Sequence, residues 1–334
     1  MFQKDLLKWY AQSARPLVFR EKKDAYSIWI SEIMAQQTRI EAMLPYYERF
    51  IREIPDIQSL AYAGEDQLTK LWQGLGYYSR VRNMKKCARV CMEKYEGKLP
   101  HTKKELEKLP GIGSYTAGAI ASIAYDEKVS AVDGNVIRVF SRLYNIQEDV
   151  RSTKVRKRIE SLVENSLADP VSQYNQALME LGALICIPKN PRCSNCPIQH
   201  HCTAFLEGEP ALLPIQTKKK ERKKENKTFY ILVCKDRIHL KKRPDTGLLA
   251  GLYGFDEKKP DRIYKQIELK KYTHVFSHIE WKMQGFVCQV EPMDQDFYTI
   301  DQIEKQFSIP SAFLPFYKQT KKIIEEEKDA RDRY

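Results

Sequence analysis

The sequence lacks any uninterrupted apolar run of the roughly 18–20 residues that a membrane-spanning helix needs. Its first residues, Met1 to Asp5, also lack the apolar core of a secretory signal peptide. We therefore expect the chain to stay in a reducing cytoplasm, where its eight cysteines are thiols or metal ligands rather than structural disulfides.

Acidic residues are in the minority: the chain has 44 Asp and Glu but 56 Lys and Arg, which gives a formal net charge of +12. This excess suits a partner with a phosphate backbone, because each Lys or Arg near a phosphate releases a counterion. Charge alone does not separate a nucleic-acid-binding protein from one that is merely basic and soluble.

The chain of 334 residues is long enough for two domains, and its pattern changes once. Apolar residues recur at helical spacing over much of residues 1–205, and a basic segment without an apolar period follows. Strand-like runs at 229–234 and 275–281 come after it. We predict a mostly α domain over 1–214, a solvated linker over 215–227 and a small α+β domain over 228–334.

Four of the cysteines lie within seventeen residues at the spacing C-x6-C-x2-C-x5-C, namely Cys186, Cys193, Cys196 and Cys202. Three prolines keep this loop irregular, so the four sulfurs can converge. Four thiolates suit either a tetrahedral zinc or a [4Fe–4S] cluster, and the spacing does not choose between them. The remaining four cysteines are predicted to be core residues, although Cys87 and Cys91 lie one helical turn apart and could pair on a metal.

A glycine-containing turn joins two predicted helices at Leu109–Ala119. Pro110 ends the first helix, and Gly111 and Gly113 are expected to permit a turn that few other residues adopt. Such a turn points backbone N–H groups at a helix start, which suits a phosphate. Asp133 precedes another predicted helix, where the helix dipole favours an anion, although an ordinary capping aspartate explains it equally simply.

Together, Gly111–Gly113, Val132–Asn135 and the four-cysteine loop resemble the endonuclease III superfamily of DNA glycosylases. Residues 31–38 (SEIMAQQT) and 74–80 (GLGYYSR) resemble its adenine-specific, MutY-type branch. The resemblance implies a helix-hairpin-helix domain with a [4Fe–4S] cluster on loop 186–202, and a small Nudix-like C-terminal domain. It further implies a nucleoid-associated monomer that removes adenine paired with 8-oxoguanine or guanine from duplex DNA.

The resemblance also implies catalytic roles. Glu32 matches the general acid that protonates adenine, and its apolar neighbours are expected to raise its pKa; the alternative is a surface glutamate. Asp133 matches the ionised carboxylate that stabilises the sugar cation, and Asn135 matches a residue that holds sugar and water. Tyr115 stands where bifunctional relatives carry a Schiff-base lysine, so we predict a glycosylase without lyase activity.

Further residues match DNA contacts of the family, either beside the extruded base or opposite it. They are Arg20, Gln37, Thr38, Leu75, Tyr77, Gly111, Gly113, Phe276, Ser277 and His278. A core role for Leu75, Tyr77 and Tyr78 is the alternative. Phe19, Ala35 and Gln176 depart from the family's usual residues, which leaves the details of base selectivity open.

Three alternative functions make different demands on these residues. A bifunctional glycosylase and lyase acting on damaged pyrimidines would need a lysine at position 115. A non-enzymatic, metal-containing DNA-binding protein would tolerate Asp133→Asn. A Nudix hydrolase is disfavoured because the acidic run that binds its metal is not visible in the sequence.

Overall fold

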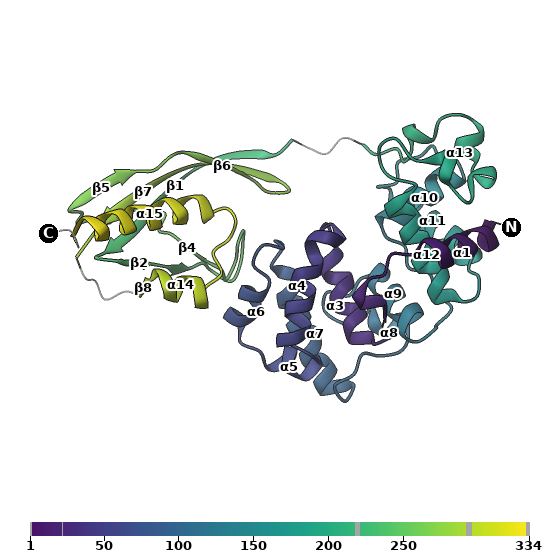
Figure 1. Ribbon diagram of the computed structural model, residues 1–334, viewed down its shortest axis with the longest axis horizontal. Helices are drawn as coiled ribbons and strands as arrows, with labels where there is room; N and C mark the ends of the chain where they lie inside the picture. The colour runs from purple at the N-terminus through teal and green to yellow at the C-terminus, as the bar shows by residue number, and fades with distance from the viewer. Residues whose placement is uncertain (1, 22, 218–220, 292–295, 332–334) are drawn as a thin grey trace. The chain divides into compact units, whose positions relative to one another are not determined.

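The computed structural model describes residues 2–21, 23–217, 221–291 and 296–331, which form two compact units (Figure 1). Unit 1 comprises residues 1–62 and 83–218, and unit 2 comprises residues 63–82 and 219–334. Each unit is described by itself.

Unit 1 is built from helices. They are α1 (Phe2–Ser13), α2 (Val18–Glu21), α3 (Ala25–Ala35), α4 (Ile40–Glu53), α5 (Ile57–Tyr62), most of α7 (Ser79–Lys94), α8 (Lys103–Leu106), α9 (Ser114–Ala124), α10 (Gly134–Leu143), α11 (Thr153–Asn165), α12 (Val171–Leu184) and α13 (Thr203–Leu206), with short 3-10 turns at Cys193–Asn195, Gln199–His201 and Pro210–Leu212. No helix among the described residues has both the length and the apolar character needed to cross a bilayer.

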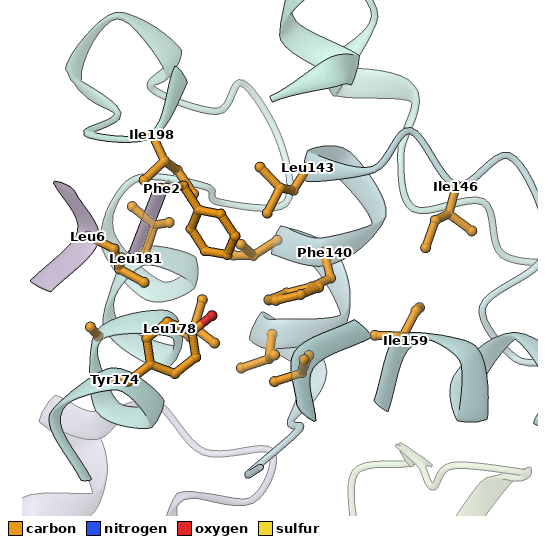
Figure 2. Close-up of a cluster of buried hydrophobic side chains, with 14 of the residues drawn as sticks. Phe2, Leu6, Phe140, Leu143, Ile146, Ile159, Tyr174, Leu178, Leu181 and Ile198 are labelled. Atoms are coloured by element: carbon orange, nitrogen blue, oxygen red, sulfur yellow. The ribbon is translucent and has the colours of Figure 1, made fainter. Parts of the chain in front are cut away.

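One hydrophobic core of unit 1 lies where α1, α10, α11 and α12 face one another (Figure 2). Phe140 from α10 and Tyr174, Leu178 and Leu181 from α12 are fully buried there. Their spacing of three and four residues puts them on one face of each helix, as the sequence predicted. This core fixes the direction of α10, and therefore the place where α10 begins.

The predicted turn between helices is present between α8 and α9. Gly111 has φ +78°, and a Cβ there would lie 2.7 Å from Cβ of Asn83, so both backbone and space require glycine. The expectation for Gly113 was wrong: its φ is −93° and a Cβ would meet no atom within 4 Å. Gly113 occupies the N-cap of α9 and has no side chain to cap it, so the helix N-terminus is left uncovered.

Unit 2 contains a mixed sheet. Among its described residues, six strands pair in the order β5-β7-β1-β2-β8, with β6 also on β7, and β3 pairs with β4 separately. The elements are α6 (Glu65–Leu71), β1 (Lys223–Cys234), β2 (Arg237–His239), β3 (Lys241–Lys242), β4 (Tyr253–Gly254), β5 (Lys265–Glu268), β6 (Tyr272–Val275), β7 (Ile279–Gln289), β8 (Phe297–Thr299), α14 (Ile300–Gln306) and α15 (Leu314–Arg331). Phe229, Trp281, Phe313 and Phe316 are buried in the core of this unit, and Phe316 belongs to α15.

The boundaries differ from the predicted ones in two places. β1 begins at Lys223, inside the predicted linker, because it pairs in parallel with β7 from Ile279 onward. The segment 63–82 belongs to unit 2, where Lys70 Nζ donates to the Phe307 carbonyl at 2.8 Å. These contacts join residues that are far apart in the chain, so no local sequence pattern predicts them.

The strand predicted over 275–281 is also divided. β6 ends at Val275, residues 276–278 form a turn, and β7 begins at Ile279. The Phe276 N–H donates to the Ile279 carbonyl at 2.8 Å and closes the turn. The three residues predicted to contact DNA therefore occupy a hairpin tip rather than a strand interior.

Candidate active site

A cavity of about 980 Å³ lies within unit 1, with walls from α3, α9, α10 and α12. Glu32, Tyr115, Asp133 and Asn135 all line it. The fold thus brings together four residues that the sequence spreads over about a hundred positions. Arg20, Gln37 and Thr38 line the same cavity.

Glu32 faces the cavity from α3 and is otherwise enclosed by protein. Burial raises the pKa of its carboxyl group from 4.5 to about 7, although a hydrogen bond from the Tyr115 hydroxyl works in the opposite direction. Burial also raises the pKa of Tyr115 well above its ordinary value, so the phenol stays neutral and donates. Near neutral pH, Glu32 is therefore able to hold or release a proton.

Asp133 is the N-cap of α10. One carboxylate oxygen accepts the Val136 N–H at 2.8 Å, and the other accepts Asn135 Nδ2 at 2.6 Å. Burial raises the pKa of Asp133, and these hydrogen bonds oppose the rise. The sequence argument considered only the helix terminus, which favours the anion; enclosure by protein acts the other way and is the larger influence.

Asn135 is held from two sides. Its Oδ1 accepts Arg138 Nη2 at 2.8 Å, and Gly182 on α12 allows α12 to pack closely, because a Cβ there would lie 2.5 Å from Cβ of Asn135. Arg138 also donates from Nε to the Cys186 carbonyl at 2.6 Å. The first turn of α10 is consequently fixed to the start of the four-cysteine loop.

A third buried carboxylate in the cavity wall was missed by the sequence argument. Glu180, with 1% of its side chain exposed, accepts Arg15 Nε and Arg20 Nη2, each at 2.7 Å. Burial alone would raise the pKa of Glu180, but these hydrogen bonds bring it below the ordinary value. In the sequence, the feature that could have indicated a role for Glu180 is its position one helical turn after Gln176, which also lines the cavity.

Two residues predicted to intrude into DNA have left-handed backbones. Gln37 has φ +59° and Tyr77 has φ +47°, a conformation that costs energy for residues other than glycine. Gln37 is exposed at the cavity rim, and Tyr77 is 48% exposed in unit 2. Leu75 is only 7% exposed, so its packing in the core favours the structural alternative over intrusion. Tyr78 is likewise buried and bonded to Ser308.

Unit 2 carries the remaining predicted contacts. Tyr77 Oη lies 3.4 Å from Ser277 Oγ, which connects the 74–80 segment to the tip of the β6–β7 hairpin. Ser277 and His278 are exposed, whereas Phe276 packs edge-on against Trp281 at 4.9 Å between ring centroids. Phe276 therefore stabilises the hairpin tip that presents its two neighbours.

The four cysteines of loop 186–202 surround one small cavity of about 30 Å³. Within the described ranges, no group of three His, Cys, Asp or Glu side chains is arranged to hold a single metal ion. Arg142, which is fully buried, donates to Cys186 Sγ at 3.3 Å and to the Ile187 carbonyl at 2.8 Å. Four thiols around a shared space beside a fixed cation fit an anionic iron–sulfur cluster. Cys87 and Cys91, by contrast, are fully buried in the core.

Three family models match the chain. One describes HhH-GPD superfamily base excision DNA repair proteins and covers residues 30–165. The iron–sulfur binding domain of endonuclease III covers residues 186–202, and a NUDIX domain covers residues 228–319.

Among similar proteins, an adenine DNA glycosylase of Buchnera aphidicola subsp. Baizongia pistaciae is 36% identical over 84% of this chain and 83% of the relative. An adenine DNA glycosylase of Mus musculus is 34% identical over 85% of this chain and 70% of the relative. A solved thermostable thymine-DNA glycosylase superposes with a TM-score of 0.57 at 25% identity, covering 62% of this chain and 95% of that one. An endonuclease III–DNA complex superposes with a TM-score of 0.52 at 22% identity, over 61% of this chain and 94% of the other, and so supports the fold alone.

Proposed function

Because this chain belongs to the adenine DNA glycosylases of the HhH-GPD base excision repair superfamily, we propose that it hydrolyses the N-glycosidic bond of adenine paired with 8-oxoguanine or guanine. It is a DNA glycosylase that removes adenine from mispairs in duplex DNA. The proposal also covers the identity of the base opposite adenine and the catalytic role of each residue. It includes the absence of lyase activity, and action as a monomer on the DNA of the nucleoid.

The chain carries a [4Fe–4S] cluster on Cys186, Cys193, Cys196 and Cys202. Held by these four thiolates, a cluster would crosslink the loop, whose exposed Lys189 and Arg192 would then be available to phosphates. Arg142 neutralises part of its charge from the protein side.

The reaction begins with a proton on Glu32. Its pKa of about 7 keeps much of the carboxyl protonated near neutral pH, so it can donate to a ring nitrogen of adenine as the base leaves. Tyr115 fixes the orientation of the carboxyl group by its hydrogen bond. After the base departs, the Glu32 carboxylate accepts a proton from the attacking water.

The sugar becomes positively charged as the bond breaks. Asp133 lies in the same cavity and is proposed to provide the countercharge; burial raises its pKa, and its N-cap hydrogen bonds limit that rise by favouring the anion. Asn135, held by Arg138, offers an amide to the sugar or to the water. A tyrosine at position 115 cannot form a Schiff base, so strand cleavage is not expected.

The adenine must leave the helix to reach these groups. The cavity accommodates an extruded base beside Phe19, Gln176 and the Glu180–Arg20 pair. Both Glu180 oxygens are occupied by Arg15 and Arg20, so the carboxylate holds the partly exposed Arg20 guanidinium in place, and that guanidinium offers donors to a ring nitrogen of adenine. In unit 2, the exposed Ser277 and His278 beside Tyr77 are proposed to contact the oxidised guanine.

The observation that carries the proposal is the convergence of Glu32, Tyr115, Asp133 and Asn135 on one cavity. The test uses duplexes with A opposite 8-oxoguanine, A opposite G, and a pyrimidine lesion, each analysed with and without hot alkali. We expect cleavage of the first two only after alkali, and none with Glu32→Gln. Product from the pyrimidine lesion alone would contradict the proposal, and strand cleavage without alkali would contradict the monofunctional assignment.

A further inference from the structure

The chain leaves unit 1 along a fixed path after its last short turn. Arg142 Nε donates to the Leu213 carbonyl at 3.0 Å, and Leu213 is only 2% exposed. The start of segment 213–217 is thereby attached to α10, the helix whose first turn carries the predicted catalytic groups.

The end of the same segment is held by the loop that follows α10. The Val150 N–H donates to the Ile215 carbonyl at 3.1 Å. Asp149 accepts the N–H of Thr217 at 3.3 Å and also the Thr217 hydroxyl, while Arg151 Nη1 donates to the Thr217 carbonyl. Backbone and side chains of three consecutive residues therefore clamp two residues of the segment.

Gln216, between the clamped residues, lines the same cavity as Asp133 and Asn135. Its Oε1 faces Arg151 Nη2 at 3.5 Å. The guanidinium can only donate, so the oxygen of the amide points toward it, and the NH2 group is the part that remains for a ligand. An NH2 donor requires an acceptor, and phosphate oxygens are the acceptors that glutamine amides meet most often on DNA backbones.

We propose that Gln216 is a substrate-positioning residue that donates a hydrogen bond to a phosphate of the adenine-bearing strand, and that Asp149, Arg151 and Thr217 hold it there. This rests on the proposed function for the identity of the strand. On this proposal, segment 213–217 forms part of the DNA-binding wall of the cavity.

The test measures equilibrium binding rather than activity. Dissociation constants for an A:8-oxoguanine duplex are measured by fluorescence anisotropy in a Glu32→Gln background, so that the adenine stays in place. Adding Gln216→Ala should weaken binding about five-fold, the effect of losing roughly one net hydrogen bond. Gln216→Glu should weaken it further, because it places a carboxylate beside a phosphate. Thr217→Val should weaken it in the same direction by loosening the clamp.

Neutral methylphosphonates are then placed singly at the phosphates within three positions of the adenosine. At one position the Gln216→Ala effect should diminish, since the methyl group replaces one non-bridging oxygen and the remaining oxygen, no longer charged, is a weaker acceptor. Gln58, exposed on α5 and away from the cavity, supplies the matched control Gln58→Ala, which should bind as the parent does. Parental affinity in Gln216→Ala, or an undiminished Gln216→Ala effect at every methylphosphonate position, would overturn the proposal. Adenine release by wild-type protein, assayed separately, reports on the proposed function itself.

Discussion

The raised pKa of Glu32 predicts that this residue weakens the fold at alkaline pH. In the unfolded chain the carboxyl ionises near 4.5, whereas in the folded protein it ionises near 7. The folded state therefore retains a proton that the unfolded state has lost, so stability falls as pH rises from about 4.5 to about 7. Each pH unit within that window costs about 1.4 kcal/mol, or about 3 kcal/mol once the group is fully ionised.

Glu32→Gln removes this penalty because an amide does not ionise, while its oxygen still accepts from Tyr115. Relative to wild type, the variant should be more stable by about 1 kcal/mol at pH 5.5 and by about 3 kcal/mol at pH 8.5. It should also release no adenine. Thermal midpoints of the two proteins at both pH values measure the difference, and Glu53→Gln, at an exposed position on α4, is the control.

A stability difference between Glu32→Gln and wild type that is the same at pH 5.5 and pH 8.5 would refute the reasoning. It would mean that the Glu32 carboxyl has the same protonation state at both values. The single-turnover rate of adenine release by wild type should fall above about pH 7 for the same reason, since the proton donor is lost.

Other changes have defined outcomes. Tyr115→Phe removes a hydrogen bond that lowers the pKa of Glu32, so the alkaline limb of the rate profile should move to higher pH; an unchanged limb would argue against the contact. Asp133→Asn keeps an N-cap but loses the countercharge, so adenine release should fall about 100- to 1000-fold with duplex binding retained. Glu180→Gln leaves Arg20 without its carboxylate partner and leaves Arg15 with Glu41 alone, so it should destabilise the fold by about 3 kcal/mol in chemical denaturation. Gly111→Ala should destabilise the fold by more than about 1 kcal/mol, whereas Gly113→Ala, which meets open space, should change the unfolding midpoint little.

Some features of this protein can be predicted from its sequence because they depend on interactions between neighbouring residues. Thr102 caps α8 by accepting the Glu105 N–H, and Asp133 caps α10 by accepting the Val136 N–H, both at spacings of three residues. The positive φ of Gly111 and the grouping of four cysteines are similarly short-range features. Such features depend on a few adjacent residues, so they can be predicted from the sequence alone.

The wall of the cavity around Glu32 could not be predicted from the sequence in the same way. Glu180 meets Arg15 across 165 positions of chain, and neither residue carries a local signal of the other. The assignment of Leu75 also required the structure, because a glycine-flanked leucine is equally compatible with an exposed wedge and a buried core residue. Only packing distinguishes them.

The sequence by itself therefore determined the hairpin, the helix caps, the grouping of four cysteines and the residue types able to perform acid-assisted base removal. The tertiary structure alone decided that Glu32 ionises near pH 7, that Arg15 and Arg20 share Glu180, and that residues 63–82 pack with the C-terminal sheet. The physical reason is the same in each case. Burial, desolvation and long-range pairing depend on which distant segments enclose a group, and that is a property of the folded chain rather than of its local pattern.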